Sequence, residues 1–218
     1  MSVQVKICGI STPEAMTAAV EGGAALVGLV FYPPSPRAVT PAQAAALAAR
    51  VPQGVIKTGL LVDADDATIE AILKEVPLDL LQLHGGESPE RVAAVRARFG
   101  LPVMKVVKLR QAGDLEAVAP FLAVADRLLF DAKPPAAMTG ALPGGNAVAF
   151  DWTILAGTTW PLPWMLAGGL TPENVARAVA LSGAPAVDVS SGVEDAPGRK
   201  SVHKIKAFLA AARALASA

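Results

Sequence analysis

The chain has 218 residues, of which 53% are hydrophobic and only 17% charged, and its 19 basic side chains balance 19 acidic ones. This composition excludes a disordered chain, and the zero net charge excludes a general nucleic-acid binder. No apolar run reaches the ~18 residues of a membrane span, and the start of the sequence lacks a signal-peptide pattern. One cysteine permits neither an intrachain disulfide nor a thiolate metal cluster. We therefore expect a cytoplasmic protein without membrane or nucleic-acid partners.

Eight short runs rich in Val, Ile and Leu recur along the chain, and each has the length of a strand. Most lack strict alternation of polar and apolar side chains, which is typical of parallel strands covered on both faces. The runs occupy residues 3–7, 25–31, 55–62, 78–83, 102–107, 126–130, 163–167 and 185–189.

Helices are predicted between these strands. Four of them start at a Ser or Thr followed by Pro and end near a glycine, which is the usual pattern of helix start and stop; the four capping residues are Thr12, Thr40, Ser88 and Thr171. Gln43 also fits a capping box with Thr40. Weaker helical patterns cover residues 66–76, 112–119, 151–156 and 201–216.

Eight alternating strands and helices form either a closed (β/α)8 barrel or a doubly wound open sheet. No GxGxxG motif follows the first strand, which disfavours a dinucleotide-binding open sheet. We therefore predict one compact (β/α)8 barrel domain over residues 1–218. The stretch 132–150 is rich in Pro and Gly and predicts a long loop after the sixth strand, a candidate lid.

In such a barrel the catalytic residues lie at the carboxyl ends of the strands. The first strand alternates, so that Gln4, Lys6 and Cys8 are predicted to point into the barrel. An ammonium group on the same face stabilises a thiolate, which makes Cys8 a candidate general base and Lys6 a candidate partner of the thiolate or of substrate charge. The alternative is that Cys8 is a small buried hydrophobic residue.

Three further strand ends carry candidate polar groups. Arg37 lies in the proline-stiffened loop after the second strand and suits a carboxylate or phosphate contact, unless it is a solvated surface residue. His84 ends the fourth strand, as a general acid or base or as a hydrogen-bonded supporting residue. Asp131 ends the sixth strand after four apolar residues, and this desolvation suits a general acid; the alternative is an ion pair with Lys6 or Lys133.

The last two strand ends are rich in glycine and serine. Gly168 and Gly169 follow the seventh strand, and Ser190, Ser191 and Gly192 follow the eighth. Phosphate sites in this fold are often built from the loops after these two strands, where backbone N–H groups are free. We therefore expect a phosphate-binding site there.

Seven motifs, in order along nearly the whole chain, carry a resemblance to a known family. They are KICGI (6–10), PPSPR (33–37), LQLHG (81–85), LLFDAK (128–133), FDW (150–152), LAGGLTPENV (166–175) and DVSSGVE (188–194). Together they resemble the phosphoribosylanthranilate isomerases of tryptophan biosynthesis. The stretch GGNAVAFDW departs from the family pattern at Asn146 and Ala147, where a Gly-Gly-Thr-Gly sequence is usual.

The resemblance implies that the chain converts N-(5-phosphoribosyl)anthranilate into the 1-deoxyribulose 5-phosphate derivative. It makes Cys8 the general base, Asp131 the general acid and Arg37 the contact to the anthranilate carboxylate. It makes the glycine–serine loops after the seventh and eighth strands the phosphate site. We further predict that Lys6, His84 and Asp188 belong to the substrate-binding residues. The resemblance implies no metal and no cofactor, a phosphosugar as the only small-molecule partner, and a monomer or a homodimer.

Other phosphosugar barrels are the nearest alternatives. A ribulose-phosphate epimerase would need metal ligands at the rim, but the chain has two histidines, and His203 falls on the predicted last helix. A histidine-pathway aminoaldose isomerase is expected to carry aspartates at the ends of the first and fifth strands, which are absent here. A catalytically silent phosphate-binding barrel or a pathway scaffold is disfavoured by the pair Cys8 and Asp131.

Overall fold

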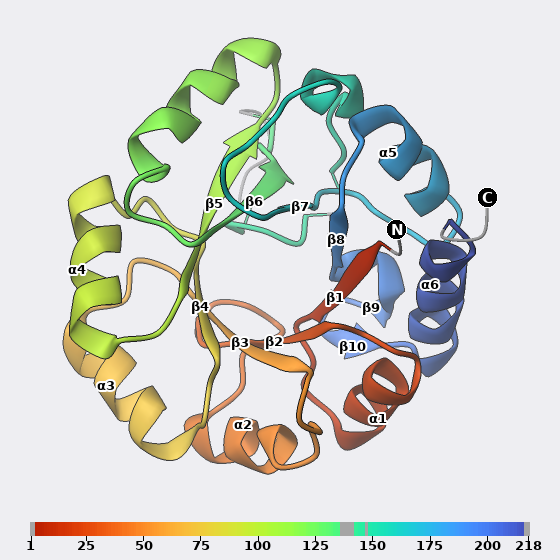
Figure 1. The fold of residues 1–218 in the computed structure, drawn as a ribbon. Helices are drawn as coiled ribbons and strands as arrows, with labels where there is room; N and C mark the ends of the chain where they lie inside the picture. Colours follow the sequence, from red (N-terminus) through yellow and green to blue (C-terminus); the bar gives the residue numbers. More distant parts are fainter. Residues whose placement is uncertain (1–2, 136–141, 147, 216–218) are drawn as a thin grey trace.

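The computed structural model describes residues 3–135, 142–146 and 148–215. Eight parallel strands close into a barrel in chain order, with β8 paired to β1 (Figure 1). The predicted (β/α)8 fold and its eight strands are therefore confirmed. The strands are β1 (Gln4–Cys8), β2 (Leu26–Val30), β3 (Ile56–Leu61), β4 (Leu80–Leu83), β5 (Val103–Leu109), β6 (Arg127–Ala132), β7 (Trp164–Leu166) and β8 (Ala186–Val189).

Helices surround this barrel on its outer face (Figure 1). The α-helices are α1 (Pro13–Glu21), α2 (Pro41–Ala48), α3 (Asp66–Glu75), α4 (Pro89–Phe99), α5 (Val175–Ser182) and α6 (Val202–Ala214). Two of the connections predicted as helices are 3₁₀ turns, η1 (Ala112–Phe121) and η2 (Trp152–Leu155), and a third, η3 (Ser191–Val193), follows β8. The strands β9 (Glu194–Ala196) and β10 (Arg199–Lys200) form an antiparallel pair that the sequence patterns did not predict.

Three of the four predicted helix starts are confirmed. The side chains of Thr12, Thr40 and Ser88 each accept a hydrogen bond from the backbone three residues later. The fourth prediction was wrong, because α5 begins at Val175 rather than at Pro172. The Asn174 side chain accepts from the Thr171 N–H at 2.8 Å and donates to the Gly169 carbonyl at 2.9 Å, which folds residues 171–174 into a separate turn.

Apolar side chains fill two separate layers. One layer lies between the strands and the helices and includes Ile7 and Leu81, so the outward direction predicted for Ile7 is confirmed. The other fills the barrel interior with the residues Leu26, Leu80, Met104, Leu129 and Met165. Each of these interior residues precedes the last residue of its strand. The later inward positions are free to carry polar groups, and this places the site at the carboxyl end of the barrel.

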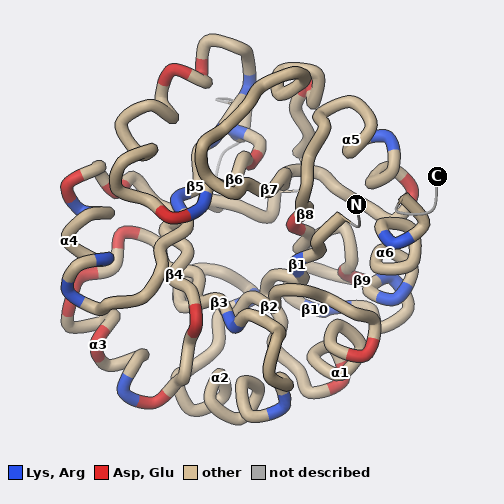
Figure 2. Tube along the Cα trace, viewed as in Figure 1, with Lys and Arg blue, Asp and Glu red and all other residues tan. Residues whose placement is uncertain are grey.

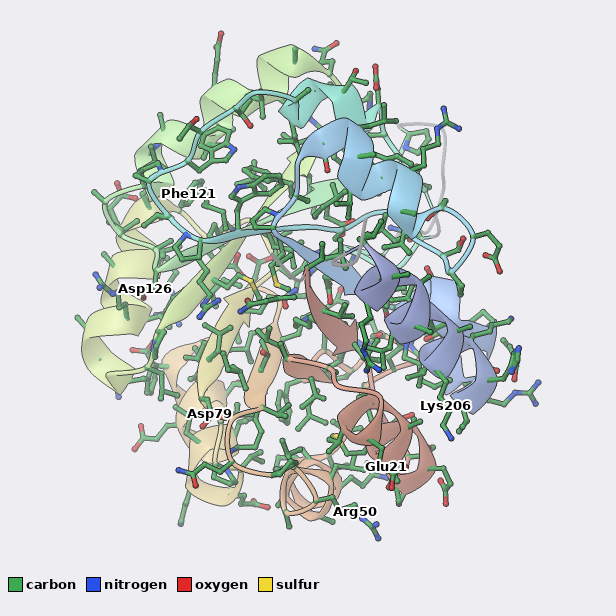
Figure 3. The ribbon with its side chains drawn as sticks, turned by 45° about the vertical axis from the view of Figure 1, so that its right-hand side comes forward. Glu21, Arg50, Asp79, Phe121, Asp126 and Lys206 are labelled. Carbon is green, nitrogen blue, oxygen red and sulfur yellow. The ribbon has the colours of Figure 1, made fainter. Side chains whose placement is uncertain are left out.

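Basic and acidic residues are interspersed along the chain trace around the outside of the barrel (Figure 2). Glu21, Arg50 and Lys206 illustrate this at the outer edge of the helical ring (Figure 3). Among the described helices none combines the length and apolar character needed to cross a bilayer.

Candidate active site

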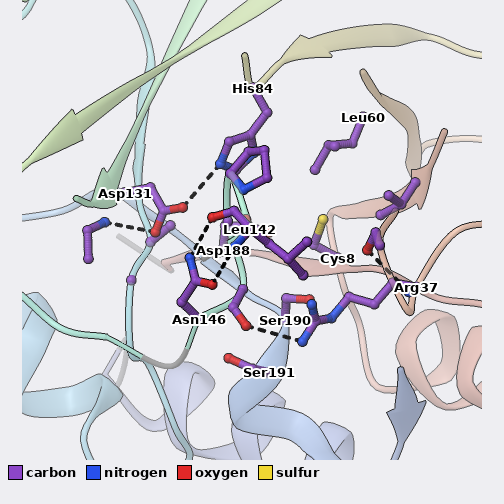
Figure 4. A pocket seen from close by; sticks show the side chains of 18 of the residues that line it. Cys8, Arg37, Leu60, His84, Asp131, Leu142, Asn146, Asp188, Ser190 and Ser191 are labelled. Atoms are coloured by element: carbon purple, nitrogen blue, oxygen red, sulfur yellow. Dashed lines mark hydrogen bonds and ion pairs between the residues drawn. The ribbon is translucent and has the colours of Figure 1, made fainter. Parts of the chain in front are cut away.

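One pocket opens at the carboxyl ends of the strands, where polar side chains gather (Figure 4). Apolar residues of β2 and β3, including Val30 and Leu60, form one wall. The predicted site residues that line it are Cys8, Arg37, His84, Asp131, Gly168, Gly169, Asp188, Ser190 and Ser191. Barrel closure thus brings together predicted residues from six different strand ends.

Cys8 ends β1 and is almost fully buried at the pocket wall. Beneath it lies Lys6, whose side chain has 0% exposure and whose Nζ donates to Asp188 Oδ1 at 3.0 Å. The register of β1 and β8 places Lys6 opposite Asp188, so the ion pair follows from the strand pairing. Gly28 on β2 lies opposite Cys8 and leaves the space that the thiol and the ammonium group occupy.

The electrostatics of this group follow from its burial. Burial raises the pKa of the Cys8 thiol. The Lys6 ammonium group lowers this pKa, and the Asp188 carboxylate raises it. Burial alone would lower the pKa of Lys6, but the negative charges of Asp188 and Cys8 outweigh it and raise that pKa. Lys6 therefore favours the thiolate as expected, yet the net pKa of Cys8 lies above its ordinary value.

Two predicted binding residues do not reach the pocket. Lys6 has no exposed surface, so it acts on the pocket through Cys8 and Asp188 rather than by touching a substrate. Gly192 lies where a Cβ would collide with the carbonyl of Leu170. The loop after β8 therefore packs closely against the loop after β7 at this point, and any larger residue would separate them.

Asp131 is the penultimate residue of β6 and is held by two hydrogen bonds. The Ala132 N–H donates to Oδ1 at 2.8 Å, and His84 Nε2 lies 3.2 Å from Oδ2. The other ring nitrogen of His84, Nδ1, lies 3.1 Å from the amide nitrogen of Gln82. His84 is therefore a hydrogen-bonded partner of Asp131. The alternative ion pair with Lys6 or Lys133 is absent, because these lysines contact Asp188 and Asp114.

Arg37 is 5% exposed and forms a two-point ion pair with Glu194. Its Nε and Nη2 donate to the two carboxylate oxygens, both at 2.8 Å. The interpretation of Arg37 as a solvated surface residue was therefore wrong. Lys200 also donates to Glu194, at 2.7 Å, so two cations share one carboxylate and leave a net positive charge beside the pocket. Burial would raise the pKa of Glu194, but Arg37 and Lys200 outweigh it and lower that pKa.

The loops after β7 and β8 form part of the rim of the pocket. Gly168 and Gly169 have φ values of +88° and +65°, which favour glycine, and a Cβ at Gly168 would lie 2.8 Å from the Ala132 nitrogen. Lys200 Nζ donates to the carbonyl of Ser190 at 2.9 Å and to its hydroxyl at 3.2 Å. Bare backbone, hydroxyl groups and a buried ammonium are the groups that bind a phosphate.

The described part of the long loop after β6 covers the pocket. Residues 142–146 and 148 line it, and the backbone of Gly144 lies so close to His84 that a Cβ there would come within 2.6 Å of the imidazole ring. Asn146 closes this turn by hydrogen bonds to the N–H and the carbonyl of Leu142 at 3.0 and 2.7 Å. Ala147, the other departure from the family pattern, lies outside the described residues.

Sequence patterns missed Gln82, Glu194 and Lys200 as parts of this site. Gln82 and Glu194 both lie inside motifs that were recognised, and Gln82 also shares the inward alternation of β4 with His84. Lys200 had no local signal, because it reaches the site through the unpredicted β9–β10 pair. No cluster of three or more His, Cys, Asp and Glu side chains in the described parts of the chain is arranged to hold a metal ion.

A closed parallel barrel with a carboxyl group, a thiol and a rim of groups suited to phosphate at its carboxyl end is typical of a (β/α)8 enzyme that acts on a phosphorylated small molecule. Residues 5–211 match the family model described as N-(5'phosphoribosyl)anthranilate (PRA) isomerase. The chain belongs to this family. The predicted function, isomerisation of N-(5'-phosphoribosyl)anthranilate in tryptophan biosynthesis, is thereby confirmed.

Relatives named N-(5'-phosphoribosyl)anthranilate isomerase match along their whole length. The protein of Paramagnetospirillum magneticum is 64% identical over 213 residues, which cover 98% of each chain. The protein of Rhodospirillum centenum is 60% identical over 215 residues, covering 99% of this chain and 100% of its own.

Solved structures of this family share the fold. The phosphoribosyl anthranilate isomerase of Thermotoga maritima superposes with a TM-score of 0.86 at 34% identity, covering 97% of this chain and 99% of its own. A crystal structure of such an isomerase in complex with reduced 1-(o-carboxyphenylamino)-1-deoxyribulose 5-phosphate gives a TM-score of 0.82 at 33% identity, with the same coverage.

Proposed function

We propose that this isomerase works by general acid–base catalysis, with Cys8 as the base and Asp131 as the acid, and without a metal or a redox cofactor. The observation that carries the proposal is that a thiol beside a buried ammonium group and a hydrogen-bonded carboxyl group face one pocket from β1 and β6. Figure 4 shows the two side chains on different sides of that pocket.

The first step opens the ribose ring. Protonated Asp131 donates its proton to the ring oxygen while the C1–O bond breaks, and the anthranilate nitrogen and C1 form an iminium ion. The hydrogen bond from the Ala132 N–H to Oδ1 then stabilises the carboxylate that remains. The second oxygen, Oδ2, contacts His84, which holds the carboxyl group in one orientation.

The second step removes the proton from C2. The Cys8 thiolate takes this proton, and the electron pair of the C–H bond neutralises the iminium to give an enolamine. The positive charges of the iminium and of Lys6 both lower the pKa of Cys8. They thereby offset the effect of burial, which raises the pKa of this thiol in the free enzyme. The enolamine then gains a proton at C1 and loses the C2 hydroxyl proton, which yields the ketone.

Arg37 and the two glycine–serine loops hold the two ends of the substrate. Glu194 occupies Nε and Nη2 of Arg37, while Nη1 lies near the Gly145 backbone at the pocket edge. A guanidinium presented in this way suits the anthranilate carboxylate. The loops after β7 and β8, with Lys200 behind Ser190, suit the 5'-phosphate. The apolar wall at Val30 and Leu60 lines the same pocket.

A reactive free thiol also bears on the compartment, because such thiols persist where the surroundings are reducing. We therefore propose that the protein is cytoplasmic. Fractionation of the native cells by osmotic shock, with immunodetection of the chain, tests it; recovery in a secreted or periplasmic fraction would contradict it.

The test of the mechanism is turnover of N-(5'-phosphoribosyl)anthranilate, generated in situ, by EDTA-treated protein and by single variants. Loss of a general acid or base costs typically 10²–10⁴-fold. We expect Cys8→Ala and Asp131→Asn each to lower kcat at least about a hundredfold with little change in KM. Full activity after chelation is expected. A near-normal kcat in either variant, or metal-dependent recovery, would contradict the assignment.

A further inference from the structure

Gln82 lies inside the barrel on β4, one inward position below His84, and has 0% exposure. Its amide nitrogen is 3.1 Å from His84 Nδ1. Its amide oxygen, Oε1, has no hydrogen-bond partner among the described residues. A buried glutamine with one satisfied end and one unsatisfied end is uncommon, because an unpaired buried polar atom is destabilising.

The contact fixes where the imidazole proton lies. In this orientation of the amide its nitrogen faces the ring and donates, so Nδ1 accepts and carries no proton. The proton of a neutral imidazole then lies on Nε2, which is 3.2 Å from Asp131 Oδ2 and can donate to it. A directed chain of hydrogen bonds therefore runs from Gln82 through His84 to Asp131.

The opposite orientation of the amide would change this chemistry. With Oε1 turned toward the ring, Nδ1 would carry a proton, and His84 could hold a second proton on Nε2 as an imidazolium. An imidazolium beside Asp131 would hold that residue as a carboxylate in an ion pair. The rotated amide would also direct its N–H hydrogens to the side where Oε1 now finds no partner.

We infer that Gln82 is a positioning residue, which keeps His84 neutral with its proton on Nε2 and its ring directed at Asp131. This inference rests on the proposed role of Asp131 as the acid. Neutral His84 donates one hydrogen bond to Oδ2, whose second lone-pair direction stays free for the proton that Asp131 gives to the ring oxygen. After the transfer the same hydrogen bond stabilises the carboxylate. His84 thus supports both states of the acid without adding a positive charge.

The tautomer can be measured directly on the resting protein, because the chain has only two histidines and His203 is exposed on α6. Protein labelled with ¹⁵N-histidine gives long-range ¹H–¹⁵N spectra that distinguish a protonated ring nitrogen from an unprotonated one. His203→Asn identifies the His84 signals. At neutral pH we expect His84 to show a protonated Nε2 and an unprotonated Nδ1.

Substitutions at Gln82 test the cause. In Gln82→Met, which keeps the length but removes the donor, we expect a mixture of both tautomers. We expect kcat to fall by up to about a hundredfold, because a misplaced group in an active site can cost this much in rate. In Gln82→Glu, an acceptor replaces the donor, so we expect both nitrogens to be protonated. Thr58→Val is the matched control, since Thr58 is also fully buried with an unpaired Oγ1 among the described residues; it should leave the His84 spectrum unchanged.

The outcomes separate this inference from the proposed mechanism. A His84 protonated on Nδ1 in the parent protein, or a spectrum that Gln82→Met leaves unchanged, would overturn the role of Gln82 whatever the activity. If the spectra behave as expected but Asp131→Asn retains its kcat, the inference about the tautomer stands and the assignment of Asp131 as the acid fails. Should Gln82→Glu not fold, the Gln82→Met spectrum alone decides.

Discussion

Gly28 offers a quantitative test of how closely the site must be packed. A Cβ at this position would lie 2.9 Å from Cys8 Sγ and 3.1 Å from both Cys8 Cα and Lys6 Nζ. An ordinary contact begins at 3.4 Å, so Gly28→Ala must displace Cys8 by about 0.5 Å. The side chain cannot absorb this alone, because the contact with Cα involves the backbone of β1, which is paired on both edges.

Gly28→Ala should therefore lower both the unfolding free energy and kcat. Overpacking a well-filled interior costs about 1–3 kcal/mol of unfolding free energy. A displacement of ~1 Å can cost 10²-fold in rate, so a shift of half that size should lower kcat about tenfold. KM should change little, because in the proposed mechanism the substrate is held by Arg37 and the loops after β7 and β8, which belong to other strands.

Urea unfolding and steady-state turnover measure both effects in the same preparation. Gly113→Ala is the matched control, because its nearest neighbour is the flexible end of Gln111 at 4.0 Å and its φ is not in the left-handed region. The control should retain its kcat and its stability. A folded Gly28→Ala variant with unchanged kcat would refute the view that the position of the thiol limits the rate.

Three further predictions concern the charges around the pocket. Thiolate formation at Cys8, followed as the ultraviolet difference against Cys8→Ser, should show a pKa above the usual ~8.5. Lys6→Met should raise this pKa further, because the ammonium group that favours the thiolate is lost. A lower pKa in that variant would contradict the role of Lys6. Arg37→Ala and, less strongly, Glu194→Gln should raise KM while kcat falls less, and an unchanged KM in Arg37→Ala would remove this residue from the site. Folding lowers the pKa of Glu194, so its ionised form stabilises the folded protein. This contribution is complete at a pH above the unfolded pKa of ~4.3 and is lost as the pH falls through the lower pKa of the folded state. The difference in unfolding free energy between the parent and Glu194→Gln should therefore shrink in acid. A difference in urea midpoint that stays constant from neutral pH to pH ~3 would contradict this linkage.

Local patterns in the sequence were enough to predict the barrel. A helix cap depends on residues within one turn, so Thr12, Thr40 and Ser88 could be identified from their neighbours. Strand-sized apolar runs and their alternation depend on the same short range, and they placed Cys8 on the inner face of β1 correctly. The start of α5 was wrong because the Asn174 side chain offered the backbone a competing turn, and this competition is not visible in the Thr171–Pro172 pair.

The sequence by itself therefore determined the fold, the family and the strand ends at which the chemistry lies. Only the tertiary structure decided which of those groups touch. Lys6 meets Asp188, Arg37 meets Glu194 and His84 meets Asp131 across 182, 157 and 47 positions of the chain. These pairs depend on the register in which the barrel closes, and that register is a property of all eight strands together rather than of any one motif.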